Sequence, residues 1–335
     1  MKVLFIGGTG IISSACARLA LERGIDLYLL NRGQSARPIP PGAKVLLGDI
    51  HDPASARAAL GDHRFDAVVN WIVFTPDQLD IDFDLFRGRT GQYIFISSAS
   101  AYQTPPAALP VTEGTLLDNP YWEYSRNKIA CEERLVRAYR EEKFPITIVR
   151  PSHTYDERLL PFHGGWTMME RMVQGKPVVV HGDGTSLWTL THNTDFAKGF
   201  VPLLGNPQAL GNAFQITSDE LLSWNQIYEA LAEAVGAELK AVHISSEFII
   251  RAAQQVGMDL QGTLLGDKSH SAIFDNSKIK RFVPGYQAVI PFREGIKRTI
   301  AWYRADPARM LILEENNRML DFVISAYEKS LNTFR

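Results

Sequence analysis

A tyrosine, a lysine and a serine in this sequence have the types and spacing that proton transfer beside a redox cofactor requires. Tyr124 and Lys128 lie four residues apart in the segment YSRNK, so on a helix they share one face. A nearby ammonium and a cationic nicotinamide both favour the phenolate, which lowers the pKa of tyrosine toward the working pH. Ser98 follows an apolar run and could hydrogen-bond the substrate oxygen. We predict that Tyr124 is the general acid or base, assisted by Ser98 and Lys128.

The glycine-rich segment near the N-terminus has the pattern of a phosphate-binding loop. Gly7-Gly8-Thr9-Gly10 lies between the apolar run 2–6 and a helix-forming segment. Gly7 permits a tight turn, Gly10 lets the backbone approach a pyrophosphate, and the N–H groups of the following helix point at that anion. Ser13 stands where a third glycine is expected, and its small side chain still permits close packing. We predict a dinucleotide site that includes the loop residues Gly7, Thr9, Gly10, Ile11 and Ile12.

The residues that end the second predicted strand bear on which dinucleotide binds. An acidic residue there accepts bonds from the ribose 2′-OH and repels a 2′-phosphate. The sequence has Asn31-Arg32 instead, and an arginine could pair with a 2′-phosphate, which favours NADP. The alternative is NAD, with Asn31 bonding the ribose and Arg32 stacking on the adenine. Asp49 and Ile50 are expected at the adenine edge.

The elements that must position these residues alternate between strands and helices. Short apolar runs alternate with helix-forming segments, which is typical of a parallel, doubly wound sheet. Right-handed crossovers place the first strand centrally, with its carboxyl end at the ligand crevice. The predicted fold class is therefore α/β, with a Rossmann-type sheet. The predicted strands are 2–6, 26–30, 44–47, 66–72, 92–97 and 145–150, and the predicted helices are 13–23, 54–60 and 124–142.

The alternation weakens after about residue 155. Two further helices are predicted at 165–174 and 223–235, the second beginning at Ser223 as its N-cap. Residues 212–217 have the pattern of one more strand of the first sheet. We predict a dinucleotide-binding domain over 1–155, and a smaller, mixed substrate lobe over 156–335 that is interleaved with it through that returning strand.

Composition excludes several classes of protein. The chain has 335 residues, of which 45% are hydrophobic and 21% charged, so it is not a disordered chain. The net charge of −2 provides no broad positive field, so we expect no nucleic-acid partner. Apolar runs are far shorter than a membrane span, and the N-terminus lacks signal-peptide features, so a cytoplasmic protein is expected. Cys16 and Cys131 are the only cysteines, and no ligand spacing suggests a metal site.

Taken together, the motifs resemble the extended short-chain dehydrogenases/reductases, the NAD-dependent epimerase/dehydratase family. The resemblance implies that Ser98, Tyr124 and Lys128 are the catalytic residues, and that Lys128 also bonds the nicotinamide ribose. It also implies a substrate domain from the C-terminal half, and a homodimer for which the helix 124–142 and the one before the fifth strand could form the interface. The segments that carry it are GGTGIIS (7–13), GDI (48–50), FISSASAY (95–102), VTE (111–113), YSRNK (124–128), VRPSHTY (149–155), HGDG (181–184) and SWNQI (223–227).

Departures from the family pattern concern the substrate. His153 stands where an asparagine usually meets a nucleotide sugar, and Trp188 stands where an arginine usually grips the diphosphate. Asn70-Trp71 replaces small residues after the fourth strand. The changes at His153 and Trp188 weaken the case for a conventional nucleoside-diphosphate sugar. The overall sequence pattern is similar to an atypical branch of the family that includes chloroplast stem-loop-binding proteins. Further candidates are Asn70 and Pro151 for the cofactor, and Ser100, His153 and Trp188 for the substrate.

These observations predict NAD(P)-linked redox chemistry at a secondary alcohol or ketone, on a sugar or sugar nucleotide. Oxidation followed by re-reduction on the other face gives an epimerase. A net NADPH-dependent ketone reductase is one alternative, and a non-catalytic RNA- or partner-binding family member is another. Dehydration is disfavoured because Ala99 and Ser100, which follow Ser98, supply no acid to expel water.

Overall fold

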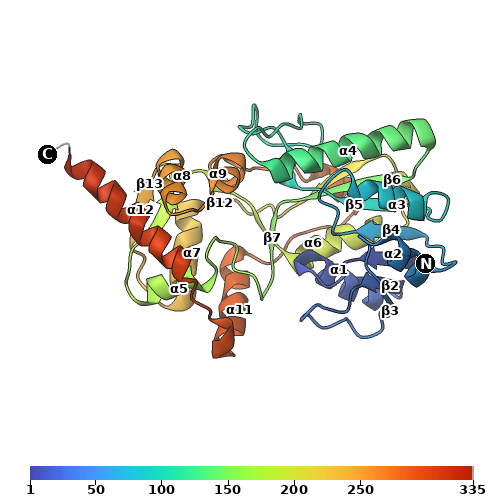
Figure 1. The fold of residues 1–335 in the computed structure, drawn as a ribbon, viewed down its shortest axis with the longest axis horizontal. Helices are drawn as coiled ribbons and strands as arrows, with labels where there is room; N and C mark the ends of the chain where they lie inside the picture. The colour runs from blue at the N-terminus through green and yellow to red at the C-terminus, as the bar shows by residue number, and fades with distance from the viewer. Residues whose placement is uncertain (334–335) are drawn as a thin grey trace.

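A seven-stranded parallel sheet forms the larger part of the molecule (Figure 1). The computed structural model describes residues 1–333. The first strand lies in the interior of the sheet, as predicted, and the Rossmann-type α/β fold class is confirmed. In spatial order the strands are β11 (Ala213–Ile216), β6 (Ile146–Pro151), β5 (Tyr93–Ile96), β4 (Ala67–Asn70), β1 (Lys2–Ile6), β2 (Asp26–Asn31) and β3 (Lys44–Leu47).

Helices cover both faces of this sheet, which explains why its central strands are continuous apolar runs. Val3 and Phe5 of β1 pack in one apolar core, whereas Leu4 and Ile6 pack in the other. The first core is covered by α1 (Ile11–Glu22), α6 (Asn193–Phe200) and α10 (Ser277–Phe282), and the second by α2 (Pro53–Leu60), α3 (Gln78–Phe86) and α4 (Glu123–Glu142).

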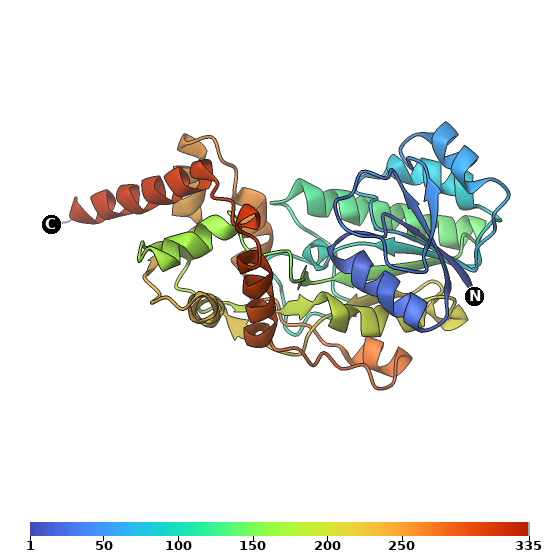
Figure 2. The same ribbon diagram turned by 90° about the horizontal axis from the view of Figure 1, so that it is seen from below.

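A second group of elements lies beyond the carboxyl ends of the strands (Figures 1 and 2). Its helices surround an apolar core of their own, and α12 runs to the C-terminus at the far end of the molecule (Figure 2). The helices are α5 (Trp166–Val173), α7 (Trp224–Val235), α8 (Ser246–Gln255), α9 (Gln261–Thr263), α11 (Phe292–Arg304) and α12 (Glu314–Asn332). The strands form three pairs, β7 (His153–Tyr155) with β10 (Leu190–His192), β8 (Val178–His181) with β13 (Ala241–Ile244), and β9 (Leu187–Trp188) with β12 (Leu222–Ser223).

Local signals in the sequence account for several helix starts. The Asp52 side chain accepts bonds from the N–H groups of Ala54 and Ser55 at the start of α2. Ser223 and Gln226 form a capping box at the start of α7, as the N-cap prediction requires. The helix expected before the fifth strand is α3, whose bounds were not predicted because its apolar positions alternate with aspartates. Within residues 1–333, no helix is both long and apolar enough to cross a membrane.

Candidate active site

The glycine loop between β1 and α1 has the geometry of a phosphate-binding turn. Gly7 has φ +83°, and a Cβ there would lie 2.7 Å from Cγ2 of Ile72, so only glycine fits. Gly10 is the N-cap of α1 and carries no side chain that would block an anion. Ser13 Oγ accepts a 2.7 Å bond from Gly10 N–H and donates a 2.9 Å bond to the Gly7 carbonyl. Ser13 therefore closes the loop at the position where a third glycine was expected.

A cleft of about 690 Å³ extends from this loop along the ends of β2 and β3. A glycine turn that opens into a cleft lined by polar side chains fits a dinucleotide, because the turn suits its pyrophosphate and the polar side chains suit its ribose. Arg32 faces Asp49 across the cleft, with 3.9 Å between guanidinium nitrogen and carboxylate oxygen. The predicted cofactor residues on its wall are Gly7, Thr9, Gly10, Asn31, Arg32, Asp49 and Ile50.

Besides Lys128, four other predicted cofactor residues lie outside this cleft. Ile12 and Pro151 line the adjacent cavity at the end of β6, and the Ile11 carbonyl accepts a bond from Asn193. Asn70 is buried in the core: its Nδ2 donates to Asp82 Oδ2 at 2.8 Å, and its Oδ1 accepts from Ile72 N–H. Both ends of its amide are thus bonded within the protein, and its contact with the cofactor stays a prediction.

The three predicted catalytic side chains come together at the carboxyl end of the sheet. Ser98 follows β5, and α4 carries Tyr124 and Lys128 in its first turns. Lys128 Nζ lies 5.7 Å from the centre of the Tyr124 ring. It donates hydrogen bonds to the carbonyl oxygens of Val73 (2.5 Å) and Ile96 (2.8 Å). These two bonds fix the buried ammonium, which also lies 4.7 and 4.9 Å from the ring centres of Phe74 and Phe95.

Burial is the main cause of the pKa shifts of Tyr124 and Lys128. It raises the pKa of Tyr124, and the charge of Asp267 adds to that, whereas the Ser98 hydroxyl acts in the opposite direction. Burial also lowers the pKa of Lys128 to about 8. The expected lowering of the Tyr124 pKa is thus not found in this structure, because the loss of hydration outweighs the hydrogen bond with Ser98.

A chain of three serines joins the start of α4 to the end of β5. Ser125 Oγ donates a 2.7 Å bond to Ser100 Oγ, which lies 2.9 Å from Ser98 Oγ. Ser98 Oγ also accepts from the N–H of Ser100. In the Ser98–Ser100 bond either hydroxyl can donate. A hydrogen bond between Ser98 and Tyr124 also lowers the pKa of Tyr124, so the Ser98 side chain lies beside the proposed general acid or base.

Beside these residues lies a cavity of about 470 Å³, here called the catalytic cavity. Ser98 and Tyr124 form one side of it, and the three predicted substrate residues Ser100, His153 and Trp188 also line it. Burial and the neighbouring Lys268 lower the pKa of His153 to about 3, so its imidazole is neutral at physiological pH. The indole of Trp188 is buried edge-on to the His153 ring.

Asp267 and Lys268, which sequence reasoning missed, also line the catalytic cavity. They end a π-helical turn, Leu264–Lys268, and their side chains form an ion pair at 3.1 Å. Among the described residues that line this cavity, Asp267 is the only carboxylate and Lys268 the only lysine or arginine. No local pattern in the sequence marks them, because their role depends on the fold bringing them to Tyr124 across more than a hundred residues.

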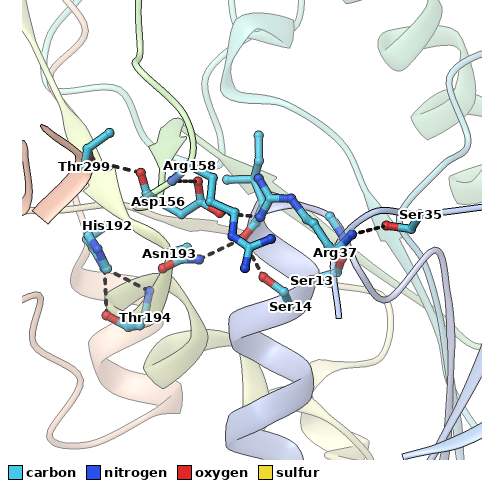
Figure 3. Close-up of polar contacts among 12 residues, drawn as sticks. Ser13, Ser14, Ser35, Arg37, Asp156, Arg158, His192, Asn193, Thr194 and Thr299 are labelled. Atoms are coloured by element: carbon cyan, nitrogen blue, oxygen red, sulfur yellow. Dashed lines mark hydrogen bonds and ion pairs between the residues drawn. The ribbon is translucent and has the colours of Figure 1, made fainter. Parts of the chain in front are cut away.

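A further polar contact joins the loop after β2 to the start of the second group of elements. Figure 3 shows Arg37 and Asp156 near the start of α1, beside Ser13 and Ser14. Arg37 Nη1 donates to Asp156 Oδ2 at 2.5 Å, and the Asp156 side chain is 1% exposed. Arg37 also lines the cofactor cleft. This ion pair therefore fastens one wall of that cleft to the segment that follows β7.

Comparison with known proteins shows the family of this chain. A model of the NAD dependent epimerase/dehydratase family matches residues 3–79 and 83–217. The chain belongs to this family. Its members are NAD-dependent oxidoreductases and isomerases, so the protein is an enzyme of that kind.

Individual relatives within the family differ in function. The 2′-dehydrokanamycin reductase of Streptomyces kanamyceticus is 25% identical over 293 residues, 86% of this chain and 80% of that protein. The chloroplast stem-loop binding protein of 41 kDa b of Arabidopsis thaliana is 26% identical over 256 residues, 72% and 65% of the two chains. The UDP-glucose 4-epimerase of Bifidobacterium longum, solved with NAD⁺ and UDP, shares the fold (TM-score 0.72, 19% identity, 92% and 99% covered).

Proposed function

We propose that the protein catalyses NAD-linked hydride transfer at a secondary alcohol or ketone of a sugar that carries no nucleoside diphosphate. The observation that carries this proposal is the convergence of Ser98 and Tyr124 on one cavity next to the glycine-loop cleft, with Lys128 buried beside the Tyr124 ring. The serine chain and the two carbonyl bonds of Lys128 hold these groups in place.

Each residue has a defined part in this chemistry. Bound NAD⁺ supplies the hydride acceptor and a positive charge close to the phenol. Tyr124 takes the hydroxyl proton of the substrate on oxidation and returns it on reduction. The Ser98 hydroxyl bonds the substrate oxygen, and the third N–H of Lys128 holds the nicotinamide ribose.

The charge of the catalytic cavity is the reason for excluding a nucleoside diphosphate. Lys268 is neutralised by Asp267, and His153 is neutral. A diphosphate would therefore bring about two negative charges into a partly buried site without a free cation to pair them. Trp188, in the position where the family's arginine is expected, lines the cavity with an indole.

We propose NAD as the dinucleotide, in place of the NADP that Arg32 alone favoured. Asp49 faces Arg32, so a 2′-phosphate bound at this guanidinium would also meet a carboxylate. The Bifidobacterium longum epimerase, whose fold this chain shares, was solved with NAD⁺. Arg32 then stacks on the adenine or stays in solvent, and Asn31 is left to bond the ribose.

Among the candidate reactions we place epimerisation first. An epimerase must keep its cofactor through a redox-neutral cycle, so it requires slow cofactor exchange. The buried Arg37–Asp156 pair fastens the loop that forms one wall of the cofactor cleft, which supports slow exchange. A net ketone reductase is the second candidate. The 25% identity to 2′-dehydrokanamycin reductase and the lack of a diphosphate clamp favour it.

Analysis of the purified protein separates the two candidates. Denaturation followed by mass spectrometry identifies any retained nucleotide, and NAD⁺ and NADPH binding is then measured on the stripped protein. Retained NAD⁺ is the result expected of an epimerase. An empty protein that prefers NADPH would instead point to the reductase and contradict our assignment of NAD.

We also propose a homodimer, with α3 and α4 of two copies forming a helical interface. Light scattering on the purified protein gives the mass in solution. Twice the chain mass supports the dimer, and that mass should halve when Arg137, on the exposed side of α4, is replaced by glutamate.

A further inference from the structure

A second cavity, of about 340 Å³, lies inside the core of the C-terminal group of elements. Its walls come from the segment before α5 and from α5, α7, α8 and α12, so it is enclosed by helices (Figure 2). Most of its lining is hydrocarbon or aromatic, and we call it the apolar cavity. Representative lining residues are Leu160, Phe162, Met168, Tyr228, Ile249 and Val323.

The apolar cavity lies next to the catalytic cavity. His153 and Lys268 line both of them. The π-helical turn Leu264–Lys268 separates the two: Leu264 faces the apolar cavity, whereas Gly266 and Asp267 face the catalytic one. Single π turns of this kind are frequent at functional sites.

The π turn is held firmly from both sides. Asn119 Nδ2 donates to the Gly266 carbonyl at 2.7 Å, and a Cβ on Gly266 would lie 2.8 Å from Cβ of Trp122. On the opposite side, His181 Nε2 and Trp224 Nε1 bond the Lys268 carbonyl at 2.9 and 3.1 Å. Glycine is therefore required at position 266, and the junction between the cavities is a fixed part of the fold.

The junction carries no net charge. The Lys268 ammonium is paired with Asp267, and the His153 imidazole is neutral. The ring N–H groups of His181 and Trp224 are already bonded to the turn, so the nearby wall has few donors to offer a ligand. An apolar group can therefore pass the junction without desolvating an unpaired charge.

We propose that the substrate is a glycoside whose apolar substituent occupies the apolar cavity while its sugar ring lies at Tyr124. Protein cores are normally close-packed, and an apolar void of about 150 Å³ is enough to bind benzene. The size of the apolar cavity and its position directly beside the catalytic cavity together favour a ligand portion over a packing defect. The catalytic half of this inference rests on the proposed function, but the apolar half does not.

Alkyl β-D-glucopyranosides from methyl to hexyl test this proposal by displacing the neutral fluorophore N-phenyl-1-naphthylamine from the protein. The fluorophore should bind with a 1:1 stoichiometry. The alkyl glycosides should displace it with an affinity that rises about three- to fourfold for each added methylene. No saturable fluorophore binding, or equal displacement by the methyl and hexyl glycosides, would overturn the proposal.

Matched variants locate the bound probe. Val323→Phe fills the apolar cavity and should abolish the chain-length dependence, whereas Val173→Phe makes the same change on the exposed side of α5 and should not. Leu160→Trp, from another wall, serves if Val323→Phe fails to fold. Unchanged probe binding in the cavity variant would also overturn the proposal. Tyr124→Phe separates the two claims: it should keep the chain-length dependence even if the proposed reaction proves wrong.

Discussion

Ser125 Oγ donates a hydrogen bond of 2.7 Å to Ser100 Oγ, although neither residue is a predicted proton donor to the substrate. Ser125 directly follows Tyr124 in the chain, and Ser100 lies two residues after Ser98. The bond therefore ties the helix that carries the general acid or base to the loop that carries its partner. Ser100 in turn is hydrogen-bonded to Ser98, and either hydroxyl can donate in that bond.

Replacing Ser125 by alanine should lower kcat about fivefold and leave KM nearly unchanged, because one neutral hydrogen bond of about 1 kcal/mol that orients Ser98 is lost. Steady-state kinetics with the fastest sugar of a panel measures the effect. Ser330→Ala, on α12 far from the site, is the control. A matching fall in kcat for the control, or none in Ser125→Ala, would argue against a positioning role.

Replacing Arg37 by alanine should lower the free energy of unfolding by about 3 kcal/mol and speed cofactor release, since the buried Asp156 carboxylate loses its partner. Urea denaturation and nucleotide dissociation kinetics measure the two effects. The Arg32→Ala variant should change stability by less than about 1 kcal/mol, because that guanidinium is 59% exposed. Adding Asp156→Asn to Arg37→Ala should restore part of the stability, and a further loss would contradict this explanation.

Replacing Asp49 by asparagine should raise the affinity for NADP⁺ several-fold and change that for NAD⁺ little, because it removes the carboxylate that faces Arg32. Titration of the stripped protein with each nucleotide measures the ratio. If the unmodified protein already binds NADP⁺ more tightly than NAD⁺, our assignment of the cofactor is wrong.

Asp82 should make stability depend on pH. Burial raises its pKa to about 7, although hydrogen bonds from Tyr93 and Asn70 act in the opposite direction. The folded state therefore binds a proton that the unfolded state has released between about pH 4 and 7, and stability falls as the pH rises through that range. Relative to Asp82→Asn, the protein should lose up to about 4 kcal/mol between pH 4 and 8 in urea titrations. A constant difference would show that Asp82 titrates normally.

The parts of the site that depend on neighbouring residues in the chain could be predicted from the sequence. The pairing of Tyr124 with Lys128 follows from helical spacing, and the role of Gly7 from the strand–turn–helix pattern. By contrast, Asp267 lies at the cavity because of a π turn that no sequence periodicity predicts. Arg37 pairs with Asp156, which is separated from it by 119 residues in the chain. Asn70 was placed correctly at a strand end, but its bond to Asp82 on a helix whose bounds were not predicted turned its side chain into the core.

The most direct test of the account is Tyr124→Phe, measured by chromatography as the rate of epimer formation from the sugar that the unmodified protein converts fastest. We predict a loss of at least a hundredfold in kcat, because proton transfer by a placed side chain contributes about 10²–10⁴-fold. NAD⁺ binding should stay within about twofold, since the phenol oxygen serves the substrate. A variant that keeps a substantial fraction of the rate while binding NAD⁺ normally would contradict the central role of Tyr124.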